Sequence, residues 1–503
     1  MTVQPAFPAF AETYDAGRAQ VVWRTLLSDL ETPVSAYLKI ADGRPFAFLL
    51  ESAERGAGAR RDRYSVIGCK PDLIWQCRDG VATVNRDALI DAAAFVPAEG
   101  APLDSLRMLV EECRFDLPAG LPPMAAGLFG YLTYDMVRLM ERLPDDNPDE
   151  LNIPDAIMTR PSLVAIFDSH TDSITLVASV FPRLGVSAID AYARAVERIN
   201  DAAVDLQRPL PYRREPRADA ALPLQATSNT SREEFHAIVE KAKEYIRAGD
   251  VFQVVPSQRM RLPFKLSPLA LYRALRRLNP SPFLFHLDFG ALSIVGSSPE
   301  ILVRLRDGKL TIRPLAGTRK RGATAEEDQA LAADLLADPK ELAEHLMLLD
   351  LGRNDVGRVA KIGTVKVTAK MQVEYYSHVM HIVSNVEGEI DPKYSAIDAL
   401  MAGFPAGTVS GAPKVRAMEI IDELEKARRG VYAGCIGYFG AGGDIDTCIA
   451  LRTAVVKDGV LYVQAGAGLV ADSDPESEYQ ETVNKAQALI RAAEAAMRTA
   501  AEN

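Results

Sequence analysis

The fold is decided by VYAGCIGYF (431–439), DIDTCIALRTAVV (444–456) and VLYVQAGAG (460–468). All three are rich in the β-branched and aromatic residues that favour strands. A glycine-rich turn at 440–443 joins the first two, and Asp458-Gly459, a dipeptide typical of hairpins, joins the last two. Strands joined by such short turns pair antiparallel, so we predict an antiparallel meander, followed by a long helix from Pro475 to about Thr499.

Short strands and helices also alternate before the meander. Ser231 and Glu234 form a capping box, and Gly249 suits the end of the helix that they begin. Asp338-Pro339 begins another helix, which we expect to run to about Leu351, and VFQVVPSQRMRL (251–262) predicts one strand. Because hairpins dominate the connections, we predict an α+β fold with antiparallel β-sheets packed as a sandwich with flanking helices.

A proline- and arginine-rich stretch near 205–230 lacks hydrophobic periodicity and is typical of a linker. We therefore predict an N-terminal domain at 1–205, a linker at 206–230 and a C-terminal catalytic domain at 231–503.

Composition excludes several classes of protein. The 503 residues include 57 Lys and Arg against 68 Asp and Glu, so the net charge of −11 gives no general attraction to nucleic acid. No run of roughly 18 apolar residues indicates a membrane span. The five cysteines are scattered without a C-x-x-C pair, and the first residues do not resemble a signal peptide. We expect a soluble cytoplasmic protein that binds neither nucleic acid nor membrane.

The register of the meander predicts an anion site. If the first hairpin is centred near Gly442, Tyr432 lies opposite Arg452, and the second hairpin then places Arg452 opposite Ala465. A phenol, a guanidinium and the backbone of 466–468 in one row would suit a carboxylate. The alternative is an arginine on the sheet surface beside loop glycines, because a slip of one residue exchanges the faces.

Two pairs of glutamates with i,i+3 spacing suggest a cation site. Glu341 and Glu344 lie on the helix after Asp338-Pro339, and Glu478 and Glu481 lie on the last helix. Four carboxylates from two helices suit Mg²⁺. Alternatively, these acids only cap helices and complement their dipoles. His381, in a strand-like stretch, is either a partly buried core residue or an acid–base group.

Ten motifs together resemble the chorismate-utilising enzymes and, within them, the anthranilate synthase component I group. They are GDVFQVVPSQR (249–259), NPSPFLF (279–285), GSSPE (296–300), PLAGTRKRG (314–322), ELAEHLMLLDLGRND (341–355), SHVMHIVSNVEG (377–388), FPAGTVSGAPK (404–414), VYAGCIGYF (431–439), the strand containing Arg452, and QAGAGLVADSDPESEYQETVNK (464–485). The match spans most of 231–503, whereas 1–205 resembles the family chiefly through LLES (49–52).

The resemblance implies a lyase that makes anthranilate from chorismate, the first committed step of tryptophan biosynthesis. Ammonia would add at C2 as the C4 hydroxyl leaves, and pyruvate would then be eliminated. Mg²⁺ is implied on Glu344 and Glu481, with Glu341 and Glu478 nearby. His381 and Thr408 are implied as catalytic or positioning residues, His381 being the expected proton donor or orienting group. The implied substrate-binding residues are Gly317, Thr318, Tyr432, Arg452, Gly466, Ala467 and Gly468.

Two positions distinguish the relatives. Gln253 stands where water-adding relatives have a lysine base, and Ala316 stands where aminodeoxychorismate synthases commonly have a nucleophilic lysine. Both favour anthranilate synthase, although aminodeoxychorismate synthase component I stays the alternative. A catalytically inactive amino-acid sensor is a third possibility, against which the intact acidic, histidine and arginine set argues.

No cysteine lies in a G-x-C-x-G motif of a glutamine amidotransferase. The resemblance therefore implies a separate glutamine amidotransferase subunit, anthranilate synthase component II, in a heterotetramer of two large and two small subunits. It also implies feedback inhibition by tryptophan. The residues matching the inhibitor site are Glu51, Ser52, Pro282, Phe283, Leu284, Tyr438 and Cys448.

Overall fold

The computed structural model describes residues 2–52, 63–211, 215–216, 224–376 and 379–502. Within these ranges 21 strands form one hydrogen-bonded network, and β10 and β19 form a separate pair. The ladders between the described strands are antiparallel. The prediction of antiparallel sheet with flanking helices is confirmed.

The described part of the N-terminal half supplies strands to this network and four α-helices, of which α4 is the longest. Its elements are α1 (Phe7–Asp15), β1 (Gln20–Leu27), α2 (Pro33–Ile40), β2 (Ala47–Glu51), β3 (Tyr64–Arg78), β4 (Val81–Asn85), β5 (Val96–Pro97), α3 (Pro102–Glu112), η1 (Pro123–Ala125), β6 (Gly127–Leu132), η2 (Tyr134–Leu139), β7 (Ala156–Asp168), β8 (Ser173–Val180) and α4 (Ala188–Gln207).

The C-terminal half begins with a short edge strand and ends in the longest helix among the described residues. Its elements are β9 (Thr227–Ser228), α5 (Arg232–Ala248), β10 (Gln253–Val254), β11 (Ser257–Pro263), α6 (Pro268–Leu278), β12 (Phe283–Asp288), β13 (Leu292–Ser298), β14 (Ile301–Arg306), β15 (Lys309–Ile312), β16 (Leu315–Lys320), α7 (Ala325–Ala337), α8 (Pro339–Gly357), β17 (Lys366–Tyr375), β18 (Val379–Glu389), α9 (Ala396–Gly403), η3 (Gly407–Val409), β19 (Gly411–Ala412), α10 (Lys414–Leu424), β20 (Cys435–Gly440), β21 (Ile445–Ile449), β22 (Thr453–Lys457), β23 (Val460–Gly466) and α11 (Pro475–Glu502).

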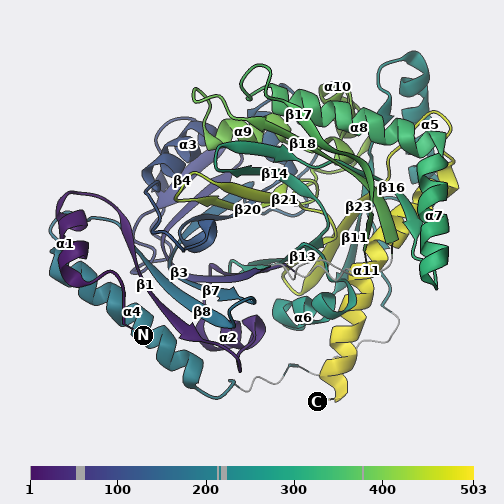
Figure 1. Cartoon of the computed structure of the whole chain (residues 1–503). Helices are drawn as coiled ribbons and strands as arrows, with labels where there is room; N and C mark the ends of the chain where they lie inside the picture. Colours follow the sequence, from purple (N-terminus) through teal and green to yellow (C-terminus); the bar gives the residue numbers. More distant parts are fainter. Residues whose placement is uncertain (1, 53–62, 212–214, 217–223, 377–378, 503) are drawn as a thin grey trace.

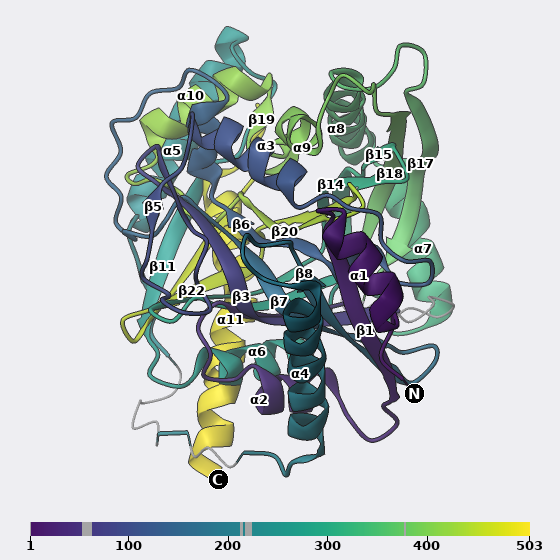
Figure 2. The ribbon, with the colours of Figure 1, turned by 90° about the vertical axis from the view of Figure 1, so that its left-hand side faces the viewer.

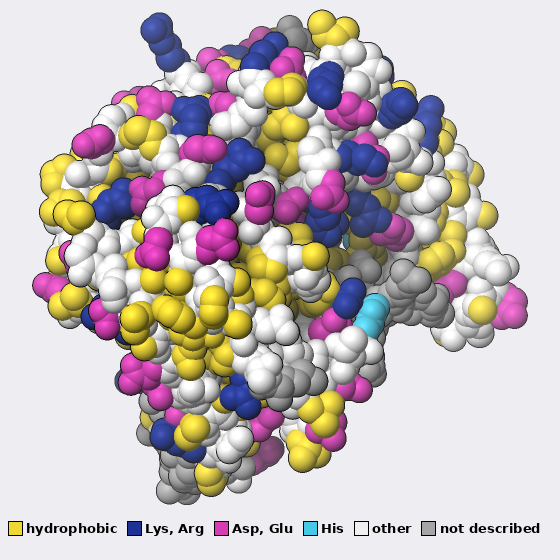
Figure 3. Space-filling model, turned by 60° about the vertical axis from the view of Figure 1, so that its left-hand side comes forward, with side chains coloured by type: hydrophobic (Ala, Val, Ile, Leu, Met, Phe, Trp, Pro, Cys, Tyr) yellow, Lys and Arg dark blue, Asp and Glu magenta, His cyan; other side chains and the backbone are white. Residues whose placement is uncertain are grey.

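Helices cover the sheet on two sides. Both ribbon views show α8, α9 and α10 on one side and α2, α4, α6 and α11 on the other (Figures 1 and 2). One hydrophobic core packs α4, α6 and α11 against strands of both halves, and a second packs α3, α8 and α9. Charged side chains of both signs are interspersed over the face drawn in Figure 3, beside a group of hydrophobic ones.

The two halves share the sheet instead of standing apart. β2 pairs with β12, and β6 pairs with β20, so ladders join residues before and after the predicted linker. Among the described residues, no helix combines the length and apolarity needed to cross a membrane. The domain boundaries stay a prediction.

The meander has the expected register. Cys435 pairs with Ile449 and Ala454 pairs with Val463, which are the registers that the two turns predict. The capping box of α5 is present, and Gly249 ends that helix with a φ of 85°. α8 runs six residues beyond the expected end, because its last turns carry the buried residues Gly352 and Val356.

The strand expected over 251–262 is wrong in one respect. It is broken into β10 and β11 at Pro256, which lacks the N–H that a continuous ladder requires. β10 pairs with β19, whereas β11 pairs with β23. The break turns Gln253 away from the main sheet and toward α8, where its side chain reaches Glu344.

Candidate functional site

The two acidic helix pairs meet. Burial raises the pKa of Glu344, and the neighbouring carboxylates Glu341 and Glu481 raise it further. The pKa of Glu478 is raised by burial and by Glu481. α8 and α11 therefore bring together the four glutamates that sequence spacing selects.

Amides and cations already contact these carboxylates. Gln253 Nε2 donates to Glu344 Oε1 at 2.9 Å, and Arg319 donates to Glu341 Oε1 at 3.0 Å. Lys485 Nζ lies 2.7 Å from Glu481 Oε1. Among the described residues, no three acidic, histidine or cysteine side chains are arranged to hold a metal ion as they stand. The donor set nevertheless fits Mg²⁺, because repulsion between neighbouring carboxylates, some of them partly buried, is what a hard divalent cation relieves.

Lys485, which contacts Glu481, also lies close to groups from several other elements. Its charge affects the pKa of Glu300, Glu344 and His381, which come from different elements. Its Nζ also donates to the carbonyl of Gly466, at the end of β23.

His381 is held by the β16 strand beside it. Its Nδ1 lies 3.0 Å from the carbonyl oxygen of Gly317 and 3.0 Å from Thr318 Oγ1. A bond to the carbonyl requires a proton on Nδ1, so the neutral ring presents Nε2 as an acceptor. Burial lowers the pKa of His381 to about 4, and the Arg452 guanidinium acts in the same direction. At neutral pH the ring is uncharged, which favours an orienting or proton-accepting role over proton donation.

Gly317 is required by its surroundings. The register shifts between Ala316 and Thr318, and Gly317 has a φ of 70°. A Cβ there would lie 3.1 Å from Glu341 Oε2 and 3.1 Å from the side chain of Ile382. This bulge therefore places the predicted substrate loop directly against the acidic cluster.

Glu300 is a candidate site residue that sequence reasoning did not assign. Thr408 Oγ1 donates to Glu300 Oε1 at 3.2 Å, so the predicted catalytic threonine contacts it directly. Burial raises the pKa of Glu300 to about 8. The available signal was a glutamate between Ser-Ser-Pro and the apolar run Ile-Leu-Val (301–303). Its carboxyl group is mostly protonated at neutral pH and is suited to donate a proton.

Arg452 is a partly buried cation near His381. Its backbone has a φ of 46°, unusual for a residue other than glycine, and burial lowers the pKa of its guanidinium. Across the described part of the chain, no carboxylate forms an ion pair with it. A desolvated guanidinium of this kind is suited to bind a substrate carboxylate.

Only part of the predicted row is shown, because Tyr432 meets Gly466 whereas Arg452 lies between β21 and β22, outside both ladders. The place of Arg452 opposite Tyr432 and Ala465 stays a prediction. A Cβ at Gly466 would lie 2.7 Å from the Tyr432 hydroxyl, and one at Gly468 would lie 2.8 Å from Gln253 Nε2. The glycines are therefore needed where the chain passes Tyr432 and the Gln253–Glu344 pair. The Ala467 N–H donates to the carbonyl of Pro256, so it shapes the site but does not offer an anion donor.

A separate cavity of about 420 Å³ is lined by all the residues predicted to form the inhibitor site. They are Glu51, Ser52, Pro282, Phe283, Leu284, Tyr438 and Cys448. Glu300 also lines this cavity, so the same carboxyl group borders the cavity and contacts the predicted catalytic residue Thr408. Glu51 already accepts from Tyr272 at 2.5 Å and from Arg276 at 2.7 Å. Its charge is thus partly neutralised before any ligand binds.

Comparisons with known proteins identify the family of the chain. A family model described as chorismate binding enzyme matches residues 60–491. Anthranilate synthase component 1 of Cereibacter sphaeroides is 60% identical over 489 residues, with 97% of each chain covered. The Pseudomonas aeruginosa protein of the same name is 48% identical over 474 residues, covering 93% of this chain and 94% of its own.

Solved structures give the same result. Anthranilate synthase component I from Streptococcus pneumoniae has a TM-score of 0.75 and 36% identity, with 93% of this chain and 99% of that chain covered. MenF, the menaquinone-specific isochorismate synthase of Escherichia coli, shares the fold with a TM-score of 0.70 at 21% identity, covering 94% of each chain. The chain belongs to the chorismate-binding enzymes and, within them, to the anthranilate synthase component I family.

Proposed function

We propose that this chain is the large subunit of an anthranilate synthase, which converts chorismate and ammonia to anthranilate and pyruvate. The observation that carries the proposal is Arg452, a partly buried cation that no described carboxylate pairs and that lies close enough to His381 to lower the pKa of that ring. Relatives that match over almost the whole chain bear this name.

Chorismate carries two carboxylates, and the site treats them differently. Arg452 and Tyr432 suit one of them directly. The second would meet repulsion from Glu344 and Glu481, so it can bind beside them only with a cation. Mg²⁺, when bound by Glu344 and Glu481, would supply that charge and draw electron density from the ring.

The remaining steps use groups of the chain itself. Glu300, protonated at neutral pH and bonded to Thr408, is placed to protonate the C4 hydroxyl as it leaves while ammonia adds at C2. Loss of pyruvate then requires removal of the C2 proton as the bond from the ring to the enolpyruvyl oxygen breaks. Neutral His381, with Nε2 as acceptor, is suited to take that proton or to orient the group that does.

When glutamine is the nitrogen source, ammonia must come from another subunit. The cysteines Cys69, Cys77, Cys113, Cys435 and Cys448 are all buried and unpaired with one another. Burial raises the pKa of Cys69 to about 11 and that of Cys435 to about 12. A glutaminase needs an accessible thiol with a lowered pKa. We therefore propose a separate glutamine amidotransferase partner, anthranilate synthase component II, in a heterotetramer, and a reducing compartment such as the cytoplasm.

The nearest alternative is aminodeoxychorismate synthase component I. Ala316 cannot form an adduct with the ring, and Gln253, whose amide is bonded to Glu344, cannot activate water as a lysine would. Both residues favour anthranilate as the product.

Tryptophan is the proposed feedback inhibitor, bound in the cavity of about 420 Å³. The cavity offers an apolar wall and the polar edge of Glu51 and Ser52, which suits an amino acid with a large ring. Because Glu51 and Leu284 come from paired strands of the two halves, a ligand there can bias how the halves are arranged.

Product analysis tests the proposed reaction. The purified chain with chorismate, Mg²⁺ and an ammonium salt should release anthranilate and an equal amount of pyruvate. Replacing ammonium by glutamine should abolish turnover, because the chain has no accessible thiol. Formation of a 4-amino product that keeps its enolpyruvyl group would instead establish the alternative activity.

The pH profile tests Glu300. In the wild type, kcat/KM should fall as pH rises through about 8, because the proton on this carboxyl group is lost there. Glu300→Gln should lower kcat by roughly 10²–10⁴-fold and remove this alkaline limb from the residual activity. The surface variant Glu389→Gln is the control. A Glu300→Gln enzyme with wild-type kcat would show that another group donates the proton.

Inhibition assays test the cavity. Ser52→Ala should weaken tryptophan inhibition about tenfold, roughly the effect of removing one hydrogen bond to a charged group, and should leave the uninhibited rate unchanged. Ser173→Ala, on β8 away from the cavity, serves as the matched control. If tryptophan inhibits the Ser52 variant as strongly as the wild type, the assignment of this cavity fails.

A further inference from the structure

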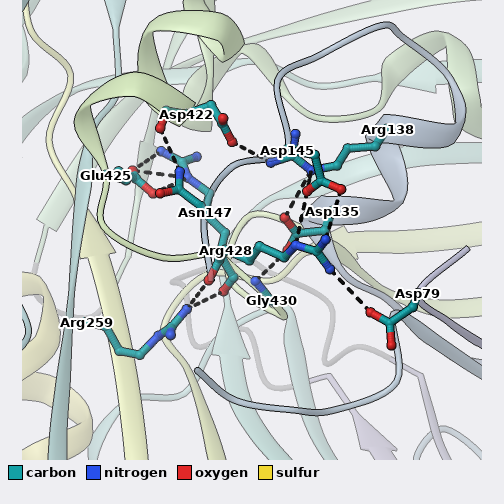
Figure 4. Close-up of polar contacts among 11 residues, drawn as sticks. Asp79, Asp135, Arg138, Asp145, Asn147, Arg259, Asp422, Glu425, Arg428 and Gly430 are labelled. Atoms are coloured by element: carbon teal, nitrogen blue, oxygen red, sulfur yellow. Dashed lines mark hydrogen bonds and ion pairs between the residues drawn. The ribbon is translucent and has the colours of Figure 1, made fainter. Parts of the chain in front are cut away.

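The turn between α10 and β20, residues 425–432, carries two consecutive arginines with different surroundings. We call this segment the arginine turn. Arg428 donates to Asp145 at 2.9 Å and 3.1 Å and reaches Asp79 at 3.5 Å, both from the N-terminal half (Figure 4). Arg429 is among the largest fully buried side chains, 2% exposed, and its donors go to the C-terminal half.

Arg429 connects three segments of backbone. Its guanidinium donates to the carbonyl oxygen of Val409 at 2.7 Å and to that of Val255 at 2.6 Å. It also donates to Glu425 at 2.6 Å, and Glu425 accepts in turn from the N–H and hydroxyl of Ser257, each at 2.8 Å. One buried ion pair therefore fixes η3, the break between β10 and β11, and the start of β11.

Each of these segments holds a group of the proposed active site. Val409 follows Thr408, and Val255 lies two residues after Gln253, the donor to Glu344. Ser257 pairs with Gly466. The guanidinium also lies 5.4 Å from the ring centroid of Tyr432. The described contacts of Arg429 include none with His381, Glu344 or Arg452, so any effect on chemistry acts through the groups that it holds.

The arginine turn is itself fixed from outside. The Gly430 N–H donates to Asp135 at 2.8 Å, and Arg259 donates to the carbonyl of Arg429 at 3.1 Å (Figure 4). Arg138 and Asn147 of the N-terminal half both bond Asp422, in the last turn of α10. The backbone of the arginine turn is thus held by residues from both halves of the protein.

Stability alone does not account for this ion pair. Removing two charges from water is expensive, and an apolar pair of similar volume is often equally stable or more so. A guanidinium, however, can bond several acceptors in one plane at defined angles, which neither an ammonium nor an apolar group can do.

Resting on the function proposed above, we propose that Arg429, together with Glu425, is a positioning residue for the chorismate reaction. It sets the relative places of Thr408, Gln253, Tyr432 and the β23 end. Chorismate binding depends mainly on charges that Arg429 does not touch, so its loss should affect kcat far more than KM. A displacement of about 1 Å within a site can lower the rate by about 10²-fold.

Adjacent arginines provide the test and its control. Arg429→Lys keeps the charge, but one ammonium cannot reach both carbonyls and Glu425 together. We expect its kcat with ammonium to fall about 10²-fold, with the KM for chorismate changed less than about threefold. Arg428→Lys, at the neighbouring position, should keep kcat within about twofold of the wild type. A wild-type kcat for Arg429→Lys would overturn the positioning role.

A double variant separates positioning from folding. Arg429→Met with Glu425→Leu removes both charges together, so no unpaired charge stays buried, although the carbonyls of Val409 and Val255 and the Ser257 N–H lose their partners. It should fold with a lowered Tm, and below that Tm kcat should stay low while KM is nearly unchanged. A folded double variant with normal kcat would contradict the proposal, and so would loss of folding in both variants, because the pair would then be a structural element only. If the wild type itself makes no anthranilate, the proposed function fails. If the wild type makes anthranilate and Arg429→Lys does so at the same rate, only the positioning role fails.

Discussion

Repulsion between carboxylates that α8 and α11 bring together is the constraint on which the rest of the site depends. Burial and neighbouring negative charge both raise the pKa of Glu344, so the folded chain holds acidic groups where ionisation is unfavourable. Gln253, Arg319 and Lys485 relieve part of this repulsion. We propose that a divalent cation relieves the rest, and that it allows a substrate carboxylate to bind where the glutamates alone would repel it.

The sheet supplies the opposite charge at a defined place. Two hairpin registers align β20 to β23, with Arg452 between β21 and β22, and the glycines at 466 and 468 let the end of β23 pass close to Tyr432 and Gln253. The positive φ values of Arg452 and Gly317 show that both sides of the site use backbone conformations that a regular strand does not. Arg429 joins two segments next to this site, because its guanidinium donates to the backbone carbonyls of Val409 and Val255.

Features fixed by local periodicity could be predicted from the sequence. The register of the meander followed from two turns. The i,i+3 spacing placed each glutamate pair on one face of its helix, whereas the convergence of the two helices was implied by the family resemblance. Seven residues that line the cavity of about 420 Å³ were predicted to lie together through family resemblance, since they come from segments far apart in sequence. Roles that depend on desolvation could not be read in this way. The pKa of Glu300 is raised by burial alone. The Ala467 N–H donates to the carbonyl of Pro256, at the break between β10 and β11.

Calorimetric titration of chorismate in the absence of ammonia tests the central claim most directly. The account predicts that Mg²⁺ strengthens chorismate binding to the wild type by at least about tenfold, and that Glu344→Gln or Glu481→Gln removes this enhancement. Chorismate affinity that is the same with and without Mg²⁺, or an enhancement that survives both substitutions, would contradict it.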